Sequence, residues 1–346
     1  MNMIKPKKLN KGDTVAILSP SWGGPSVFPH IYESGIETLE NLDLKIKEFP
    51  SARKEADYLY KNPEFRAKDI NDAFTDKEVK AIFVSIGGDD SVRILPFLNT
   101  DLILKNPKII IGYSDASTFL TYLNQMGLVT LHGPSIMAGF SQWSELGEEH
   151  QKHVKTILFD NPENYEYRPY NFYCNGYPDW SLKINTGKIN KKHKGKGWRI
   201  LQGSGSVCGR LFGGCIEVLE FMKSTKFWPN DDFWNGKILF LETSENKPTP
   251  EQVKRILRNY GMQGIFNKIS ALLIGRPRDY SEEEKKELDE SILKVVNTEF
   301  KNTSLSIITN MDFGHTDPQW ILPLGVKAEI DCARGKFRLT ERIFAN

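Results

Sequence analysis

The stretch Lys108-Ile-Ile-Ile-Gly-Tyr-Ser-Asp-Ala-Ser117 decides the fold. Its three consecutive isoleucines, at 109–111, are β-branched and apolar, and they predict a strand buried on both faces. Apolar residues then recur at helical spacing over 117–126, and Gly127 is suited to end that helix. The residues between strand and helix therefore form a sharp turn, with Ser114 at its apex.

A serine at such a turn has the geometry of a nucleophile elbow. The hydroxyl of Ser114 projects from the end of the sheet, and the first amide of the helix lies beside it, ready to receive an oxyanion. The usual pattern has glycine two places after the serine, and this chain has Ala116, which is still small. The alternative is that Ser114 only caps the helix, as serine does in many such turns. This stretch alone leaves both interpretations open.

Composition excludes several classes of protein. A chain of 346 residues is long for one core and predicts two domains. With 39% hydrophobic residues, 26% charged residues and a net charge of +2, it has no strong field that would attract nucleic acid or an anionic membrane. No stretch approaches the ~20 apolar residues of a membrane span, and the start lacks an apolar signal core. We therefore expect a cytoplasmic protein with neither nucleic acid nor membrane as a partner.

Cysteine and histidine patterns give no sign of a metal or a cofactor. The four cysteines form no CxxC pair and are expected to be reduced, mostly buried thiols. The six histidines include no HExxH motif or paired metal spacing. The cysteines are Cys174, Cys208, Cys215 and Cys332.

Strands alternate with helices through the first part of the chain. Such alternation predicts a parallel sheet covered by helices on both faces, and we place this domain at residues 1–160. In these sheets ligands bind beyond the carboxyl ends of the strands. The predicted strands are 14–18, 45–49, 80–86 and 109–111, and the predicted helices are 31–42, 63–74, 92–98 and 117–126.

The loop Gly87-Gly-Asp-Asp-Ser91 lies at the same edge of the predicted sheet. Its glycines would let backbone N–H groups approach a phosphate, or the Gly88 amide would supply an oxyanion donor. A plain tight turn is the third interpretation. Neither GxxxxGK[ST] nor GxGxxG is present, so the chain lacks a nucleotide-binding fingerprint.

Residues 161–205 differ from what precedes them. They are rich in aromatic residues, asparagine, glycine and lysine, with little periodicity, and are expected to connect two domains. Trp180 and its aromatic neighbours would either stack on a flat substrate group or pin the segment to the surface.

The second domain is placed at residues 206–346. Strands are predicted over 237–242, 269–275 and 305–310, and helices from the capping box Thr249-Pro-Glu-Gln252 to 261 and over 281–300. The alternating tail predicts a β-hairpin over 326–330 and 336–340.

Three residues follow predicted strands and have the side chains of a catalytic triad. Ser114 needs a base to remove its proton, His315 is such a base, and Glu242 would fix the tautomer of the imidazole. The order serine, acid, histidine is the one that α/β-hydrolases use, although many chains of this length contain such a triple. His132 is a second candidate for the base, with a structural role as its alternative.

Several motifs together resemble the LD-carboxypeptidase family of serine peptidases, which includes the microcin C immunity proteins. The resemblance covers nearly the whole chain in the family's order. It rests on residues 12–20, 86–90, 111–115, 132–134, 213–214, 239–242 and 313–315.

The resemblance implies an N-terminal Rossmann-like three-layer domain, a C-terminal α/β domain of swivelling type, and a site between them. It implies that Ser114 is the nucleophile, His315 the base and Glu242 its orienting acid. The amides of Gly88 and Asp115 would form the oxyanion hole. The resemblance also suggests a homodimer, and it implies acyl transfer through an acyl-enzyme.

Two branches of this family are open to the chain. The muropeptide enzymes recognise a free carboxylate and cleave an L–D bond near the chain end. The immunity branch carries a longer aromatic segment and accepts peptidyl- or aminoacyl-nucleotide analogues, and segment 161–205 favours that branch. The resemblance then suggests Trp180 as the residue that stacks on an adenine-like ring, with Glu217 and Lys247 in the same pocket. Their alternatives are a helix-face carboxylate and a solvated lysine.

Two hypotheses of other classes remain. A non-catalytic two-domain binder would keep the fold without needing Ser114, Glu242 and His315 together. A nucleotide-binding transferase would use Gly87 and Gly88 for phosphate and predicts thermal stabilisation by ATP.

Overall fold

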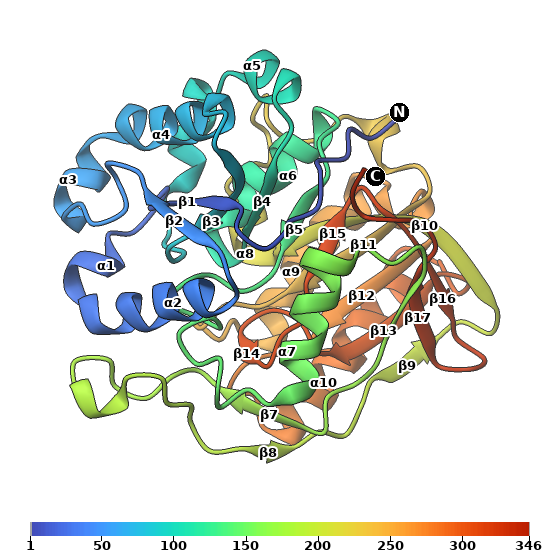
Figure 1. Cartoon of the computed structure of the whole chain (residues 1–346). Helices are drawn as coiled ribbons and strands as arrows, with labels where there is room; N and C mark the ends of the chain where they lie inside the picture. Colours follow the sequence, from blue (N-terminus) through green and yellow to red (C-terminus); the bar gives the residue numbers. More distant parts are fainter. Residues whose placement is uncertain (1, 346) are drawn as a thin grey trace.

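The isoleucine run forms β4 (Ile109–Gly112), whose four residues are all buried, inside a six-stranded sheet (Figure 1). The computed structural model describes residues 2–345. The strand order is β15-β5-β4-β3-β1-β2, and the first five strands of the chain pair in parallel, which confirms the predicted parallel sheet. The remaining strands are β1 (Thr14–Leu18), β2 (Lys45–Glu48), β3 (Val79–Val84), β5 (Thr130–His132) and β15 (Leu322–Leu324).

Helices cover both faces of this sheet, giving three layers. Figure 1 shows α4 and α2 on opposite sides of the strands. The predicted helix 92–98 is a 3₁₀ helix over Ser91–Phe97, which we call η1. The α-helices are α1 (Gly24–Val27), α2 (Pro29–Asn41), α3 (Ala56–Lys61), α4 (Pro63–Thr75), α5 (Thr100–Lys105), α6 (Ser117–Gln125) and α7 (Glu148–Lys155).

The second sheet has eight strands in the order β6-β17-β16-β10-β11-β12-β13-β9. Its four central strands are parallel, and antiparallel strands flank them on both sides. The predicted tail hairpin is confirmed as β16 and β17. The strands are β6 (Tyr165–Tyr167), β9 (Arg199–Gln202), β10 (Ser206–Cys215), β11 (Lys237–Glu242), β12 (Ala271–Gly275), β13 (Ser306–Met311), β16 (Lys327–Asp331) and β17 (Lys336–Leu339).

Three helices accompany the second sheet: α8 (Ile216–Glu220), α9 (Pro250–Met262) and α10 (Glu282–Leu293). The capping box is present at the start of α9, where Thr249 and Gln252 satisfy each other's backbone amides. The helix predicted over 281–300 ends as α10 at Leu293 and continues as a π-helical turn over Lys294–Glu299.

Segment 161–205 is built into the second sheet rather than being a bare connection. β6 pairs with β17 at one edge, and β9 pairs with β13 at the other. Between them, β7 (Phe172–Asn175) and β8 (His193–Lys194) form a small sheet with β14 (Thr316–Asp317). These strands have two to four residues each, too few to show a period in the sequence.

The two sheets meet through α6. The Cys215 amide, at the end of β10, donates a hydrogen bond to Ser117 Oγ at 3.0 Å. A Cβ on Gly214 would lie 2.5 Å from that hydroxyl oxygen, so only glycine permits this approach. β15 also ties the halves, because residues 322–324 return to the first sheet and pair antiparallel with β5. We propose the division 1–160, 161–205 and 206–346 as three units, with β15 crossing back to the first.

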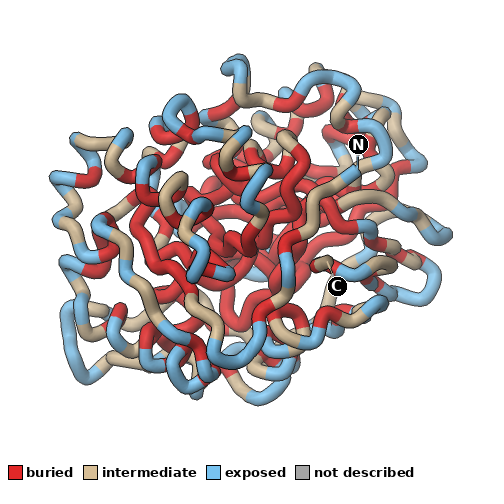
Figure 2. Tube along the Cα trace, turned by 45° about the horizontal axis from the view of Figure 1, so that its top comes forward, coloured by how far each residue is buried: buried red, intermediate tan, exposed pale blue. Residues whose placement is uncertain are grey.

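One hydrophobic core contains buried residues from both sheets. Figure 2 shows that the buried residues gather in the middle of the molecule and the exposed ones at its periphery. The ends of the chain lie together, because the Ala345 amide donates to the Pro6 carbonyl at 2.9 Å. None of the helices within residues 2–345 combines the length and apolar character that a bilayer span needs. Over the same residues, no His, Cys, Asp and Glu side chains are grouped to hold a metal ion. All four cysteines are free thiols, and Cys208 is exposed.

A fully buried ion pair connects the ends of β12 and β13. Arg276 Nη2 lies 2.5 Å from Asp312 Oδ1, and both side chains have no exposed surface. We expect Asp312→Ala to lower the free energy of unfolding by about 3–5 kcal/mol, because it leaves a buried guanidinium without its carboxylate. Urea denaturation measures this change. The matched control is Asp57→Ala, which breaks an exposed ion pair with Lys61 and should cost less than about 1 kcal/mol. Equal losses for the two variants would contradict a structural role for the buried pair.

Candidate active site

Ser114 lies at the apex of the turn that follows β4. A short 3₁₀ helix over Ser114–Ala116, which we call η2, leads directly into α6. The φ angle of Ser114 is 59°, in the left-handed region that residues with a side chain rarely adopt. Such strain persists where the surrounding structure enforces it, and it concentrates at functional sites.

Hydrogen bonds to Asp115 hold this turn in place. Its buried carboxylate accepts from Ser21 Oγ at 2.5 Å and from the Ser91 amide at 2.8 Å. Ser91 Oγ in turn donates to the Asp115 carbonyl at 2.6 Å. Burial raises the pKa of the Asp115 carboxyl, and these hydrogen bonds oppose the rise. The loops after β1 and β3 thus fix the backbone that presents Ser114.

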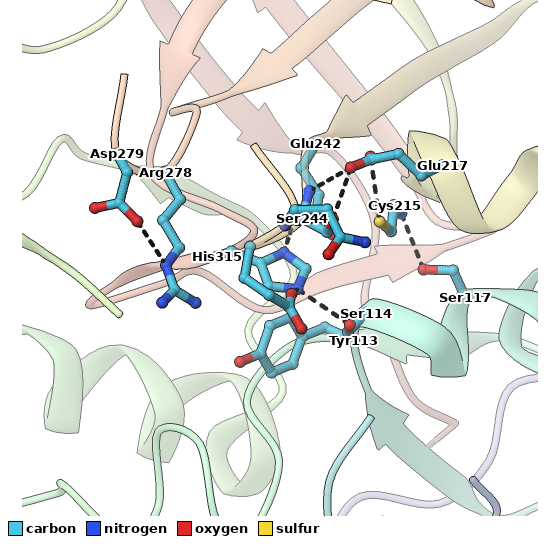
Figure 3. A network of polar contacts seen from close by, with 12 residues as sticks. Tyr113, Ser114, Ser117, Cys215, Glu217, Glu242, Ser244, Arg278, Asp279 and His315 are labelled. Carbon is cyan, nitrogen blue, oxygen red and sulfur yellow. Dashed lines mark hydrogen bonds and ion pairs between the residues drawn. The ribbon is translucent and has the colours of Figure 1, made fainter. Parts of the chain in front are cut away.

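Ser114, His315 and Glu242 lie in one connected chain of contacts (Figure 3). His315 Nε2 is 3.1 Å from Ser114 Oγ, and His315 Nδ1 is 2.6 Å from Glu242 Oε2. Ser114 belongs to the first sheet, while Glu242 ends β11 and His315 follows β13 in the second. The tertiary structure therefore brings together three residues that the sequence separates by up to 201 positions.

Two glycines make room for Glu242 beside His315. A Cβ on Gly314 would lie 2.7 Å from Glu242 Cβ and Oε2, and a Cβ on Gly275 would lie 2.9 Å from Glu242 Cβ. Gly314 also has a φ of +97°, which favours glycine. The carboxylate of Glu242 is buried and so reaches the imidazole without competition from water.

A second carboxylate, which the sequence analysis missed, contacts the same imidazole. Glu245 Oε2 lies 3.0 Å from His315 Nε2. Burial alone would lower the pKa of His315, but Glu242 and Glu245 together outweigh it and raise the pKa to about 10. Glu245 follows the predicted strand end by three residues, so its place at the carboxyl edge of the sheet was the signal that could have indicated it.

The Gly87–Gly88 loop packs directly against the turn. A Cβ on Gly87 would lie 2.9 Å from Ser114 Cβ and 3.0 Å from Ser114 Oγ. A Cβ on Gly88 would lie 2.0 Å from Ser21 Oγ, so both positions need glycine for this close approach.

A cavity of about 550 Å³ opens onto the serine. Its lining includes Gly88, Ser114, Trp180 and His315, four residues that the sequence analysis singled out, together with Glu245. The Trp180 ring lies 5.1 Å from that of Tyr177 at 32°, and 5.9 Å from that of Phe28, edge to face. Segment 161–205 thus supplies an aromatic wall of the cavity.

Comparison with known proteins identifies the family. Residues 15–133 match the family model of the LD-carboxypeptidase N-terminal domain, and residues 208–330 match that of the LD-carboxypeptidase C-terminal domain. The chain belongs to the LD-carboxypeptidase family. As a member of peptidase family S66 it is a serine-type carboxypeptidase, a hydrolase.

Curated relatives and solved structures agree over nearly the full length. This chain is 28% identical to the microcin C7 self-immunity protein MccF of Escherichia coli, covering 96% of this chain and 94% of that protein. It is also 28% identical to a probable murein peptide carboxypeptidase of Bacillus subtilis, covering 95% and 92%. A structure of MccF in complex with aspartyl sulfamoyl adenosine matches with a TM-score of 0.87 and 27% identity, covering 99% and 100%.

Two residues suggested for the pocket lie elsewhere in this chain. Glu217 Oε1 accepts hydrogen bonds from the amide of Ser244 at 3.0 Å and from its hydroxyl at 2.7 Å, so this carboxylate holds the loop after β11 (Figure 3). Lys247 Nζ pairs with Glu284 Oε1 at 2.9 Å, at the start of α10. Neither residue lines the cavity.

His132, the second candidate for the base, is buried between the rings of Tyr113 and Phe240. Burial lowers the pKa of His132 to about 3, so it stays neutral. Neither of its ring nitrogens has a hydrogen-bond partner among residues 2–345, and its ring contacts indicate a packing role.

Arg278 is a cavity residue that the sequence analysis did not name. It follows β12, at the carboxyl edge where parallel sheets bind ligands, and that position was the available signal. Its Nε lies 3.1 Å from Asp279 Oδ2, and a Cβ on Gly176 would lie 2.2 Å from its Nη2. The cavity therefore holds a cation suited to an anionic group.

Substituting Gly314 tests whether the space it leaves for Glu242 is needed for the reactivity of Ser114. We expect Gly314→Ala to slow labelling of Ser114 by a serine-directed phosphonate about 100-fold, because a Cβ there displaces Glu242 from His315. The rate of covalent labelling measures this. Gly335→Ala is the matched control, since Gly335 also has a positive φ, +62°, but nothing within 4 Å of an added Cβ. If both variants are labelled at the same rate, Gly314 is not needed to keep Glu242 in contact with His315.

Proposed function

We propose that this chain cleaves an amide bond near the C-terminal end of a small peptide, or of a peptidyl- or aminoacyl-nucleotide, through Ser114, His315 and Glu242. The observation that carries the proposal is the chain of contacts of 3.1 Å and 2.6 Å from Ser114 Oγ through the imidazole to Glu242. Composition adds the proposal of a cytoplasmic location, and the family resemblance adds that of a homodimer.

The proposed reaction is acyl transfer in two steps. The neutral imidazole of His315 takes the proton of Ser114 as Oγ attacks the substrate carbonyl. The backbone amides of Gly88 and Asp115 donate to the oxyanion, each lowering the barrier by about 3 kcal/mol. His315 then gives its proton to the leaving amine, which leaves an acyl-enzyme. Water repeats the sequence and returns Ser114 to its free form.

The division of the site between two sheets has a dynamic consequence. Because Ser114 comes from one sheet and His315 from the other, a small relative shift of the halves changes the contact between nucleophile and base. Relative motion of the two halves should therefore alter turnover.

The aminoacyl-nucleotide class is supported by the cavity wall and by a relative's ligand. Trp180 lines the cavity from a segment whose length resembles that of the immunity branch. MccF has been solved with aspartyl sulfamoyl adenosine bound. We propose that Trp180 stacks on the purine ring and that Arg278 pairs with an anionic group of the substrate.

The second candidate function is a muropeptide LD-carboxypeptidase. The Bacillus subtilis murein peptide carboxypeptidase is as similar in identity as MccF, and Arg278 would equally suit the free carboxylate at a peptide end. The substrate decides between the two.

A product assay with two substrates tests the proposal. The wild type should release sulfamoyl adenosine from aspartyl sulfamoyl adenosine, or D-alanine from a muropeptide ending in L-Lys–D-Ala. Ser114→Ala, His315→Ala and Glu242→Ala should each lower turnover by about three orders of magnitude or more, because each removes one part of a single unit. Thermal melting checks that the variants stay folded. A folded variant with near-normal turnover would remove that residue from the mechanism, and hydrolysis of neither substrate by the wild type would reject both.

The role of Trp180 has its own test. Trp180→Ala should raise KM for the nucleotide-bearing substrate about 10- to 100-fold, since base stacking contributes about 1–3 kcal/mol, with little change for a plain peptide. Steady-state kinetics on both substrates measures the difference. Trp180→Phe keeps a ring and should retain most of the affinity. Equal losses on the two substrates would refute stacking.

A further inference from the structure

One ring nitrogen in this site has two partners that make opposite demands. His315 Nε2 lies 3.1 Å from Ser114 Oγ and 3.0 Å from Glu245 Oε2. To act as a base, Nε2 must offer a lone pair to the serine hydroxyl. A carboxylate at 3.0 Å from Nε2 requires an N–H there, because a lone pair and an anionic oxygen repel each other.

The surrounding charges favour the N–H. Glu242 accepts from Nδ1 and Glu245 from Nε2, so the imidazole is held as the doubly protonated cation. Pairing with His315 lowers the pKa of Glu245 to about 2, so this carboxylate stays ionised. The other charged or titratable groups around the ring are Tyr113, His132, Tyr177, Arg278 and Asp317.

Glu245 is free to change partners. Its side chain is 53% exposed, it lies in the loop after β11, and within residues 2–345 His315 is its only ion-pair partner. Glu242, by contrast, has no exposed side-chain surface. Of the two carboxylates on the imidazole, one is fixed and the other can leave.

We propose that Glu245 selects substrates with a free α-ammonium group beside the scissile carbonyl, by exchanging His315 for that ammonium group. The inference rests on the proposed function and names the substrate class. The paired resting state is inactive, and a substrate cation releases it. A neutral group offers Glu245 no positive charge to replace the imidazolium of His315, and so would not favour its departure from His315.

The distances fit an α-nitrogen. A carbonyl carbon poised for attack lies about 3–3.5 Å from the nucleophile oxygen. The α-nitrogen of an aminoacyl group is two bonds further, about 2.5 Å from that carbon. Glu245 Oε2 lies no further from Ser114 Oγ than the two contacts through Nε2 allow. These distances allow the ammonium of an aminoacyl group that is bound for attack to pair with Glu245.

The proton count is complete with water as the acceptor. The substrate ammonium keeps its protons and pairs with Glu245. His315, left with Glu242 alone, has a lower pKa and releases its Nε2 proton to water. Nε2 is then free to take the proton of Ser114. An acyl group inside a peptide, whose α-nitrogen is an amide, lacks the cation that starts this exchange.

The first experiment measures how strongly Glu245 suppresses the reactivity of Ser114, and it needs no natural substrate. The rate of labelling by a fluorophosphonate, which carries no ammonium group, is followed against pH for the wild type and Glu245→Gln. Because the pKa of His315 is raised in the wild type, the labelling rate should rise only toward alkaline pH. In Glu245→Gln this rising limb of the pH–rate profile should move to lower pH, so that the variant is labelled about 10-fold faster than the wild type at pH 7. Asp89→Asn removes one charge from the same cavity without contacting His315 and should shift the limb less. An unchanged limb in Glu245→Gln would overturn the proposal.

The second experiment tests selection. The kcat/KM values for aspartyl sulfamoyl adenosine and its Nα-acetyl derivative are compared in both proteins. The wild type should prefer the free amine at least about 10-fold, the value of a charge-assisted contact. Glu245→Gln should lose the preference and cleave the acetyl compound faster than the wild type does. An equal loss on both compounds would falsify the selection. A wild type whose Ser114 is not labelled at all would instead refute the proposed function.

Discussion

The contact between Ser114 and His315 joins the two halves of the molecule, and the local structure around it holds these two side chains in position. On one side, Asp115 and its hydrogen-bond partners hold Ser114 in a left-handed conformation in which its hydroxyl contacts His315. On the other, glycine at 314 lets Glu242 approach the imidazole. A hydrogen bond between Ser117 and Cys215 aligns the sheets a few residues from the serine. The strained backbone at Ser114 is tolerated because two sheets with one continuous hydrophobic core hold it in place.

The charge on His315 is the second constraint. Burial disfavours a charged imidazole, yet two carboxylates stabilise it, and the raised pKa shows that the carboxylates outweigh burial. A base with such a pKa is protonated at neutral pH and inactive until one carboxylate leaves. The exposed Glu245 and the buried Glu242 therefore have different roles, although both contact the same ring. If the substrate draws Glu245 away from His315, substrate recognition and catalysis are linked at one atom, His315 Nε2.

Segment 161–205 serves both stability and the site. Its two outer strands, β6 and β9, are the edge strands of the second sheet, so that β17 and β13 are paired on both sides. Because β6 has three residues and β9 four, each edge exposes few unpaired backbone groups. The residues between them carry Tyr177 and Trp180 to the mouth of the cavity. A loop fixed at both ends by sheet pairing holds aromatic rings more rigidly than a free connection would, which suits a stacking surface.

The sequence by itself determined the local elements and the serine turn, because buried parallel strands, amphipathic helices and a capping box are written in short-range patterns. It also placed Ser114, Glu242 and His315 at strand ends, although order alone did not single them out and the family resemblance did. Only the tertiary structure decided the partners of side chains in loops: Glu245 on the imidazole, Arg278 in the cavity, and Glu217 and Lys247 away from it. The sequence also did not predict the edge strands of segment 161–205 or the return of β15 to the first sheet. The physical reason is the same throughout, since short strands and loop side chains take their positions from distant neighbours rather than from their own sequence.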